Sequence, residues 1–176
     1  MTSSVVIAAM NNSMKYYLSL ILFFTISISS LAQEQLNTSV KTIDGIIDEL
    51  LDQITIENGE KMDTATVRNL FHPSALFTVA DSEKAESVSL DDFLTLLKDP
   101  YYEEGYLEQE IHKVVDEYNG IAQVFQSFYG KDSEGAEERG INSYQLTYYG
   151  DRWWIVSLLW TIESENEGIP TKYGGE

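Results

Sequence analysis

The chain has no cysteine, and its 176 residues include only two histidines and three prolines. Without cysteine there can be no disulfide and no thiolate metal ligand, so an apolar core must hold the fold together. The histidines, His72 and His112, have no spacing typical of a zinc or iron site, and no acidic stretch has the ligand spacing of a calcium loop. We therefore expect no metal and no cofactor.

Basic residues are also scarce, with 11 Lys and Arg against 29 Asp and Glu, which gives a formal net charge of −18. A surface of this charge repels nucleic acid and anionic lipid, and no basic stripe along the chain offsets it. We therefore expect no nucleic-acid partner. The acidity by itself needs no partner, because a high net charge already keeps a protein soluble.

The one long hydrophobic run in the chain, residues 16–28, follows Lys15 and precedes Ser30-Leu31-Ala32. This order predicts a signal peptide over residues 1–32, cleaved near Ala32-Gln33. The run has 13 residues, whereas a membrane span needs roughly 20, and no cysteine follows it for lipid attachment. We therefore expect an exported protein, periplasmic or secreted, without a stable membrane anchor.

Two alternatives stay open at this end of the chain. Met14 can serve as the start, in which case residues 1–13 are an over-extended beginning, and the hydrophobic run can remain as an uncleaved signal anchor. In either case residues 33–176 are expected to form a single domain.

Three helices are predicted in the first half of the chain. Apolar residues three and four apart indicate an amphipathic helix over residues 37–55. Asp63 is a good N-cap for a short helix over residues 64–71, which Pro73 ends. Ser89 and Asp92 resemble a capping box for a helix that runs to Leu97 and ends at Pro100.

Strands dominate the rest of the chain. Residues 74–80 alternate as a strand does, and from Tyr106 onward four strands are expected. Asn119-Gly120 and Gly150-Asp151 are two-residue turns, while residues 130–140 are a charged connection that we expect to be mobile. Helices followed by a meander of strands indicate an α+β fold, with the helices on one face of a curved sheet.

Three segments, LFHPSALFT, GIAQVFQSFYG and RGINSYQLTYYGDRWWIVSLLW, resemble the nuclear transport factor 2-like superfamily, particularly its small bacterial SnoaL-like members. The resemblance covers about residues 38–163. It implies a cone of about three N-terminal helices packed on a strongly curved, mostly antiparallel sheet, with a central apolar pocket and homodimers formed through the sheet. Enzymes of this superfamily include ketosteroid isomerases, polyketide cyclases and dehydratases, and many of its other members have no assigned chemistry.

Pairing across the Gly150-Asp151 turn assigns side chains to the two faces of the last hairpin. Tyr148 is expected opposite Trp153 and Tyr144 opposite Ser157, so these residues share one face, which a one-residue shift in register would invert. We assign this face to the pocket because its polar groups are few and isolated, and the other to the dimer. The predicted pocket residues are His72, Asn142, Tyr144, Trp153 and Ser157; the predicted dimer face holds Gln145, Trp154, Leu158 and Trp160.

The first functional hypothesis is an exported domain that binds a small apolar or aromatic molecule. The alternative is an isomerase, cyclase or dehydratase, with His72 or Asp116 as the base and Tyr144 as a hydrogen-bond donor. The enzymes of the superfamily rely on a deep carboxylate, yet no acid occurs in residues 121–129, 141–149 or 153–161. His72 is equally explained as a helix-terminal residue. A domain whose pocket is filled by its own side chains is the third hypothesis.

Overall fold

A computed structural model describes residues 34, 36–97 and 104–175, and residues 39–176 form one compact unit. The predicted signal peptide and Pro100 lie outside the described residues. In the described part of the chain, no helix is long and apolar enough to cross a membrane. The helices of the unit are α2 (Ile43–Ile54), α3 (Thr64–Leu70), α4 (Leu90–Leu96) and the 3₁₀ helix η1 (Thr171–Tyr173).

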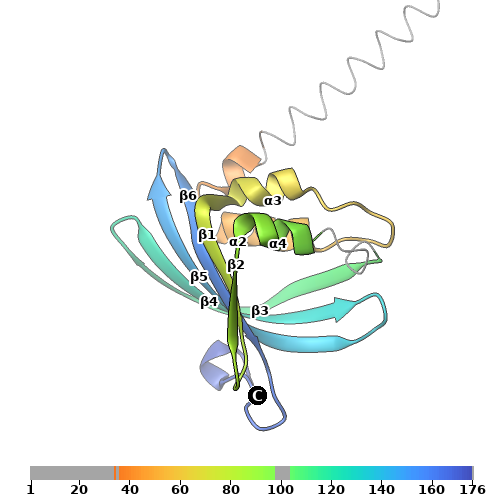
Figure 1. Cartoon of the computed structure of the whole chain (residues 1–176). Coiled ribbons are helices and arrows are strands. Elements are labelled where there is room, and N and C mark those ends of the chain that lie inside the picture. The colour runs from red at the N-terminus through yellow and green to blue at the C-terminus, as the bar shows by residue number, and fades with distance from the viewer. Residues whose placement is uncertain (1–33, 35, 98–103, 176) are drawn as a thin grey trace, which may run out of the picture. The chain divides into compact units, whose positions relative to one another are not determined.

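Six strands form one mixed sheet in the order β2-β1-β6-β5-β4-β3. The last four strands are an antiparallel meander, while β1 pairs with β6 in parallel and with β2 in antiparallel fashion. Figure 1 shows α2, α3 and α4 together on one side of the curved sheet. The predicted α+β class is confirmed. The strands are β1 (Phe71–Ala80), β2 (Ala85–Ser89), β3 (Tyr106–Tyr118), β4 (Ile121–Asp132), β5 (Glu137–Tyr149) and β6 (Arg152–Ile162).

Side-chain caps fix where the helices begin. The Asp63 carboxylate accepts hydrogen bonds from the backbone N–H groups of Ala65 and Thr66, and Ser89 Oγ accepts one from Asp92, so both predicted caps are confirmed. The helix predicted over residues 37–55 is not continuous, because residues 36–39 are helical and a turn separates them from α2. Residues 40–42 form a turn, and the Thr42 hydroxyl accepts from the Gly45 backbone to cap α2 at Ile43.

The two predicted hairpin turns are present. Asn119 and Gly120 have φ angles of 46° and 80°, and Gly150 and Asp151 have 61° and 62°, as a type I′ turn requires. The predicted mobile connection over residues 130–140 is wrong, because β4 and β5 run far into it. Only residues 133–136 remain as a turn, where the Asp132 carboxylate accepts from the Ala136 backbone at 2.8 Å.

A β-bulge in the last hairpin changes which side chains share a face. Leu146 pairs with Ile155, but Gln145 pairs with Ser157, so Val156 is an extra residue on β6. Beyond the bulge Tyr144 lies opposite Leu158, and the predicted partner Ser157 is wrong. Every β6 side chain from Ser157 onward therefore faces the side opposite to the predicted one.

The chain end covers part of the sheet face that lies opposite the helices. The Ser127 hydroxyl donates to the Tyr173 carbonyl at 2.6 Å, and the Tyr173 ring stacks on Phe125 at a centroid distance of 5.2 Å. Ile169, between β6 and η1, is buried. The helix-covered face holds the main core, in which Ile46, Ile47, Leu50, Phe77, Tyr144 and Ile155 are almost wholly buried.

Candidate functional site

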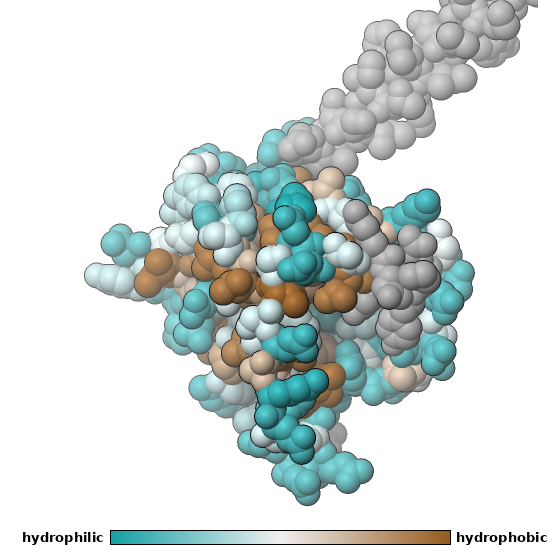
Figure 2. All heavy atoms as spheres, viewed as in Figure 1, coloured by the Kyte–Doolittle hydropathy of each residue, from teal (hydrophilic) through white to brown (hydrophobic). Residues whose placement is uncertain are grey.

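A cavity of about 310 Å³ lies between the helices and the inner face of the sheet. Its volume is at the small end of the range for ligand pockets. The walls are apolar on the helix side and mixed along the sheet. Figure 2 shows hydrophobic side chains gathered in a band across the middle of a mostly hydrophilic face, at the level of α4. The cavity is lined by Leu50, Ile54, Met62, Phe93, Leu97, Tyr106, Glu108, Phe128, Lys131, Asp132, Ala136, Glu137, Glu138, Asn142, Tyr144, Leu158 and Trp160.

Glu108 is the carboxylate that reaches this cavity from β3. Tyr106 and Glu108 point to the same face because side chains alternate along a strand. Glu108 pairs with Gly130 of β4, and Gly130 in turn pairs with Glu138 of β5. A Cβ atom on Gly130 would lie 3.0 Å from the Tyr106 hydroxyl and 3.1 Å from Glu138 Cγ. The absence of a side chain at Gly130 therefore makes the room that these polar groups occupy.

Both carboxylate oxygens of Glu108 accept hydrogen bonds. The Tyr106 hydroxyl donates to Oε2 at 3.0 Å, and Asn142 Nδ2 donates to Oε1 at 2.8 Å. Burial raises the pKa of Glu108 to about 6, the charge of Glu138 adds to this, and the two hydrogen bonds oppose it. Burial likewise raises the pKa of Glu138. A carboxyl group with a pKa of about 6, as in Glu108, can gain and lose a proton near neutral pH.

A buried amide connects this carboxylate to the rest of the sheet. Gln126 Oε1 accepts from Asn142 Nδ2 at 3.3 Å and from the Tyr144 hydroxyl at 3.1 Å, while Gln126 Nε2 donates to Glu110 at 2.9 Å. The single hydroxyl proton of Tyr144 is therefore used inside the protein. Burial, together with the nearby Glu108 and Glu110 charges, raises the pKa of Tyr144 well above its ordinary value.

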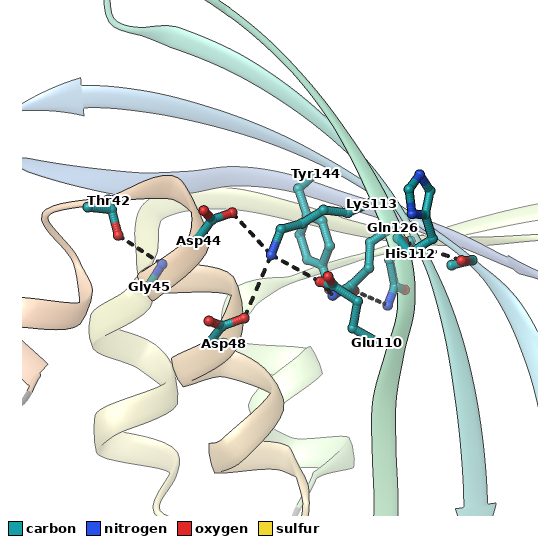
Figure 3. Close-up of polar contacts among 11 residues, drawn as sticks. Thr42, Asp44, Gly45, Asp48, Glu110, His112, Lys113, Gln126 and Tyr144 are labelled. Carbon is teal, nitrogen blue, oxygen red and sulfur yellow. Dashed lines mark hydrogen bonds and ion pairs between the residues drawn. The ribbon is translucent and has the colours of Figure 1, made fainter. Parts of the chain in front are cut away.

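Lys113 ties this network to helix α2. Its ammonium lies 3.1 Å from Glu110 and 3.1 Å from Asp44, with Asp48 at 3.7 Å (Figure 3). The Lys113 side chain is only 16% exposed, so solvent screens these ion pairs less than those on the surface. The contacts hold α2 against β3 and fix Glu110, which in turn orients the Gln126 amide.

Only some of the residues predicted for the pocket line the cavity. Asn142 and Tyr144 line the cavity. Trp153 is buried but lies outside the lining, packed edge-on against Tyr148. The prediction that Ser157 lines the pocket is wrong, because the bulge at Val156 turns this side chain to the opposite face of the sheet.

The two predicted bases do not reach the cavity. His72 is at the start of β1, where its Nδ1 accepts from the Ser74 backbone N–H at 3.2 Å, and its ring lies against Tyr149. Asp116 is exposed and pairs with Gln123, among residues that line a second hollow on the opposite face. Neither position supports a role in chemistry inside the cavity.

The residues predicted for the dimer face lie on two different faces of the sheet. Gln145 and Trp154 lie on the face away from the helices, whereas Leu158 and Trp160 line the cavity. The assignment of Leu158 and Trp160 is therefore corrected, and the reason is again the extra residue Val156.

Four polar residues of the site were missed from the sequence: Tyr106, Glu108, Gln126 and Glu138. The middles of the last three strands contain no acid, and the acid of the site lies in the first half of β3. The usable signal was the alternation Tyr106-x-Glu108 opposite Gly130, which requires the pairing of β3 with β4. In the part of the chain described, no group of three or more His, Asp or Glu side chains could hold a metal ion.

Comparison with solved structures identifies the fold. An NTF2-like protein from Cytophaga hutchinsonii aligns with a TM-score of 0.52 over 66% of this chain and 92% of its own, at 13% identity. The chain has the nuclear transport factor 2-like fold. A proposed ketosteroid isomerase from Shewanella frigidimarina aligns over the same shares, with a TM-score of 0.51 and 16% identity.

A third match comes from Xanthomonas campestris. It is a proposed association domain of calcium/calmodulin-dependent protein kinase II, with a TM-score of 0.54 and 12% identity over 70% of this chain and 86% of its own. No protein-family profile and no curated protein sequence matches the chain. At these identities the likeness extends to the fold alone, so function must be argued from the site.

Proposed function

We propose that this chain is a small-molecule-binding domain whose ligand lies in the cavity between the helices and the sheet. The observation that carries this proposal is a cavity of about 310 Å³ that is apolar on its helix side and has the carboxylate of Glu108 and the amide of Asn142 in its sheet side. Such a site fits an apolar body with one polar group, because a few polar groups fix the orientation of a ligand that apolar walls hold. Phe93, Phe128 and Trp160 supply aromatic contact area.

Fluorescence titration with the uncharged apolar probe N-phenylnaphthylamine tests the binding. Leu158 lines the cavity, and its neighbour Leu159 faces the other way and is 42% exposed, so Leu158→Phe and Leu159→Phe form a matched pair. We expect the wild type and Leu159→Phe to bind the probe equally and Leu158→Phe to bind it at least about tenfold more weakly, a loss of about 1.4 kcal/mol. Equal affinities in all three proteins would show that the probe binds elsewhere.

A second candidate function is proton transfer on a carbonyl compound, with Glu108 as the general base. The pKa of about 6 supports this candidate, because a base with a pKa near the working pH is the most effective. Tyr106 and Asn142 hold the Glu108 carboxylate in place. In this reaction the carboxylate takes a proton from the carbon next to the carbonyl, an enolate forms, and the proton returns to carbon.

Deuterium exchange separates this enzyme from a binding domain. We expect phenylbutanone in D₂O to gain deuterium beside its carbonyl group faster with the wild type than with Glu108→Gln, as followed by proton NMR. If both proteins exchange the ketone at the rate of buffer alone, the chain is a binding domain and not a proton-transfer enzyme for such ketones.

We further propose an exported homodimer formed through the sheet face away from the helices, as the resemblance to SnoaL-like proteins implies. On this face η1 covers the region of Phe125 and Ser127, and Ile121 and Leu159 remain exposed beside Gln145 and Trp154. Sedimentation velocity tests the proposal, with a dimer expected for the wild type and a shift toward monomer for Ile121→Lys. A monomeric wild type would contradict it.

A further inference from the structure

The polar end of the cavity carries negative charge from two strands. Glu108 and Glu138 flank Gly130 in one row across the sheet. Their side chains meet at the Tyr106 hydroxyl, which is 3.0 Å from a Glu108 oxygen and 3.5 Å from a Glu138 oxygen. The Tyr106 hydroxyl has one proton and cannot serve both carboxylates fully.

No side chain supplies the missing positive charge within residues 36–97 and 104–175. Neither Glu108 nor Glu138 forms an ion pair there. The lysine at the rim of the cavity, Lys131, is paired with Glu137 at 3.0 Å, and Lys113 is paired with acids of α2 and β3. Partly buried carboxylates without a cation are unfavourable, and burial raises the pKa of both groups for this reason.

The remaining walls favour an organic cation over a metal ion. The described residues contain no cluster of acids and histidines suited to a metal. Phe93, Tyr106 and Trp160 instead bring aromatic rings to the cavity, and the faces of such rings attract ammonium groups. Leucines line the space beyond them and provide contact for an apolar body.

We propose that the cavity binds a small organic cation, a protonated amine on an aromatic or aliphatic body, with its ammonium group between Glu108 and Glu138. This inference rests on the proposed binding function and names its ligand class. The ammonium donates hydrogen bonds to both carboxylates and supplies a positive charge that no side chain of residues 36–97 and 104–175 brings to them. An anionic ligand of the same shape is repelled by the same two groups.

Three ligands that differ in one group test the proposal. Phenylbutylamine, phenylbutanol and phenylbutanoate are each used to displace N-phenylnaphthylamine from the wild type at about neutral pH and about 0.15 M salt. We expect the amine to bind at least about tenfold more tightly than the alcohol, and the carboxylate to bind most weakly. Equal affinities for amine and alcohol, or a preference for the carboxylate, would overturn the proposal.

Matched variants locate the origin of the preference. Glu108→Gln and Glu138→Gln should each reduce the ratio of amine to alcohol affinity severalfold or more. Glu117→Gln removes the same charge from an exposed position on β3 outside the cavity, and should leave the ratio as in the wild type. If one cavity variant does not fold, the other variant and the comparison of the three ligands on the wild type still test the proposal.

The outcomes separate this inference from the function on which it rests. A preference for amine that survives in both cavity variants comes from the overall acidity of the chain, and overturns the inference. Probe binding without any amine preference leaves the binding function standing and removes only the ligand class. If the probe does not bind the wild type, the proposed function fails and this inference fails with it.

Discussion

Replacing Glu108 with glutamine should change how the stability of the chain depends on pH. The pKa of the Glu108 carboxyl is about 6 in the folded chain, against 4.5 for an ordinary glutamate. At about 1.4 kcal/mol per pKa unit, ionising this group destabilises the folded state by at most about 2 kcal/mol, because remaining contact with water lowers the cost.

The direction in which stability changes with pH follows from which state, folded or unfolded, binds the Glu108 proton more tightly. Below about pH 4.5 the Glu108 carboxyl is protonated in both states and contributes nothing to the pH dependence. As the pH rises from about 4.5 to about 6 the unfolded chain releases this proton first, so the contribution of Glu108 to stability falls. Above about pH 6 the full cost is present, and Glu108→Gln removes it.

Urea unfolding of the wild type, Glu108→Gln and Glu117→Gln at a series of pH values measures the effect. The difference in unfolding free energy between the wild type and Glu108→Gln should shift by up to about 2 kcal/mol toward the variant between acid and neutral pH. If the glutamine loses a hydrogen bond to Tyr106 or Asn142, the unfolding free energy changes by the same amount at every pH. The shift between acid and neutral pH is therefore unchanged. Glu117→Gln should show no such shift.

Other charged groups lie around Glu108. They are Glu138 across Gly130, Glu110 on the same strand, and Asp132, Glu137 and Lys131 at the rim of the cavity. The measured midpoint belongs to the coupled Glu108 and Glu138 pair, so the series is repeated in a Glu138→Gln background, where the midpoint should move toward lower pH. A difference between wild type and Glu108→Gln that stays constant across the pH series would refute the reasoning.

Three further substitutions test the surroundings of the site. Lys113→Met leaves three acids without their cation and should lower the unfolding free energy by about 1–3 kcal/mol in urea unfolding, whereas Lys131→Met at an exposed pair should change it little. Gly130→Ala crowds the Tyr106 hydroxyl and should cost roughly 1–3 kcal/mol in thermal unfolding and weaken probe binding; unchanged binding would contradict the account of this glycine. Ser127→Ala loses the hydrogen bond to η1 and should cost about 1 kcal/mol and speed amide exchange in η1, and an unaltered exchange rate would count against this anchoring.

Local signals in the sequence predicted much of the fold. Asp63 and Ser89 cap their helices through contacts two or three residues away, so their effect can be judged without a structure. The turns at Asn119-Gly120 and Gly150-Asp151 depend equally on neighbouring residues. By contrast, β2 was not predicted, because its five residues are mostly exposed and carry no clear hydrophobic alternation.

The site was harder to predict because it depends on the register between distant strands. One extra residue, Val156, is enough to exchange the faces of Ser157 and Leu158, and nothing in the local sequence marks that bulge. Glu108 lies in an acidic stretch that is typical of a solvated face. It becomes a cavity residue only because Gly130 lies opposite and the helices cover that side of the sheet.

The most direct test of the account is the titration of the Glu108 side-chain carboxyl by carbon NMR, with and without N-phenylnaphthylamine. The resonance is assigned by its loss in Glu108→Gln. We expect a midpoint near pH 6 in the free chain, and a higher midpoint with the probe, which displaces water from around the carboxylate. A midpoint near 4.5 that the probe does not move would contradict the claim that Glu108 lies in the wall of a ligand-binding cavity.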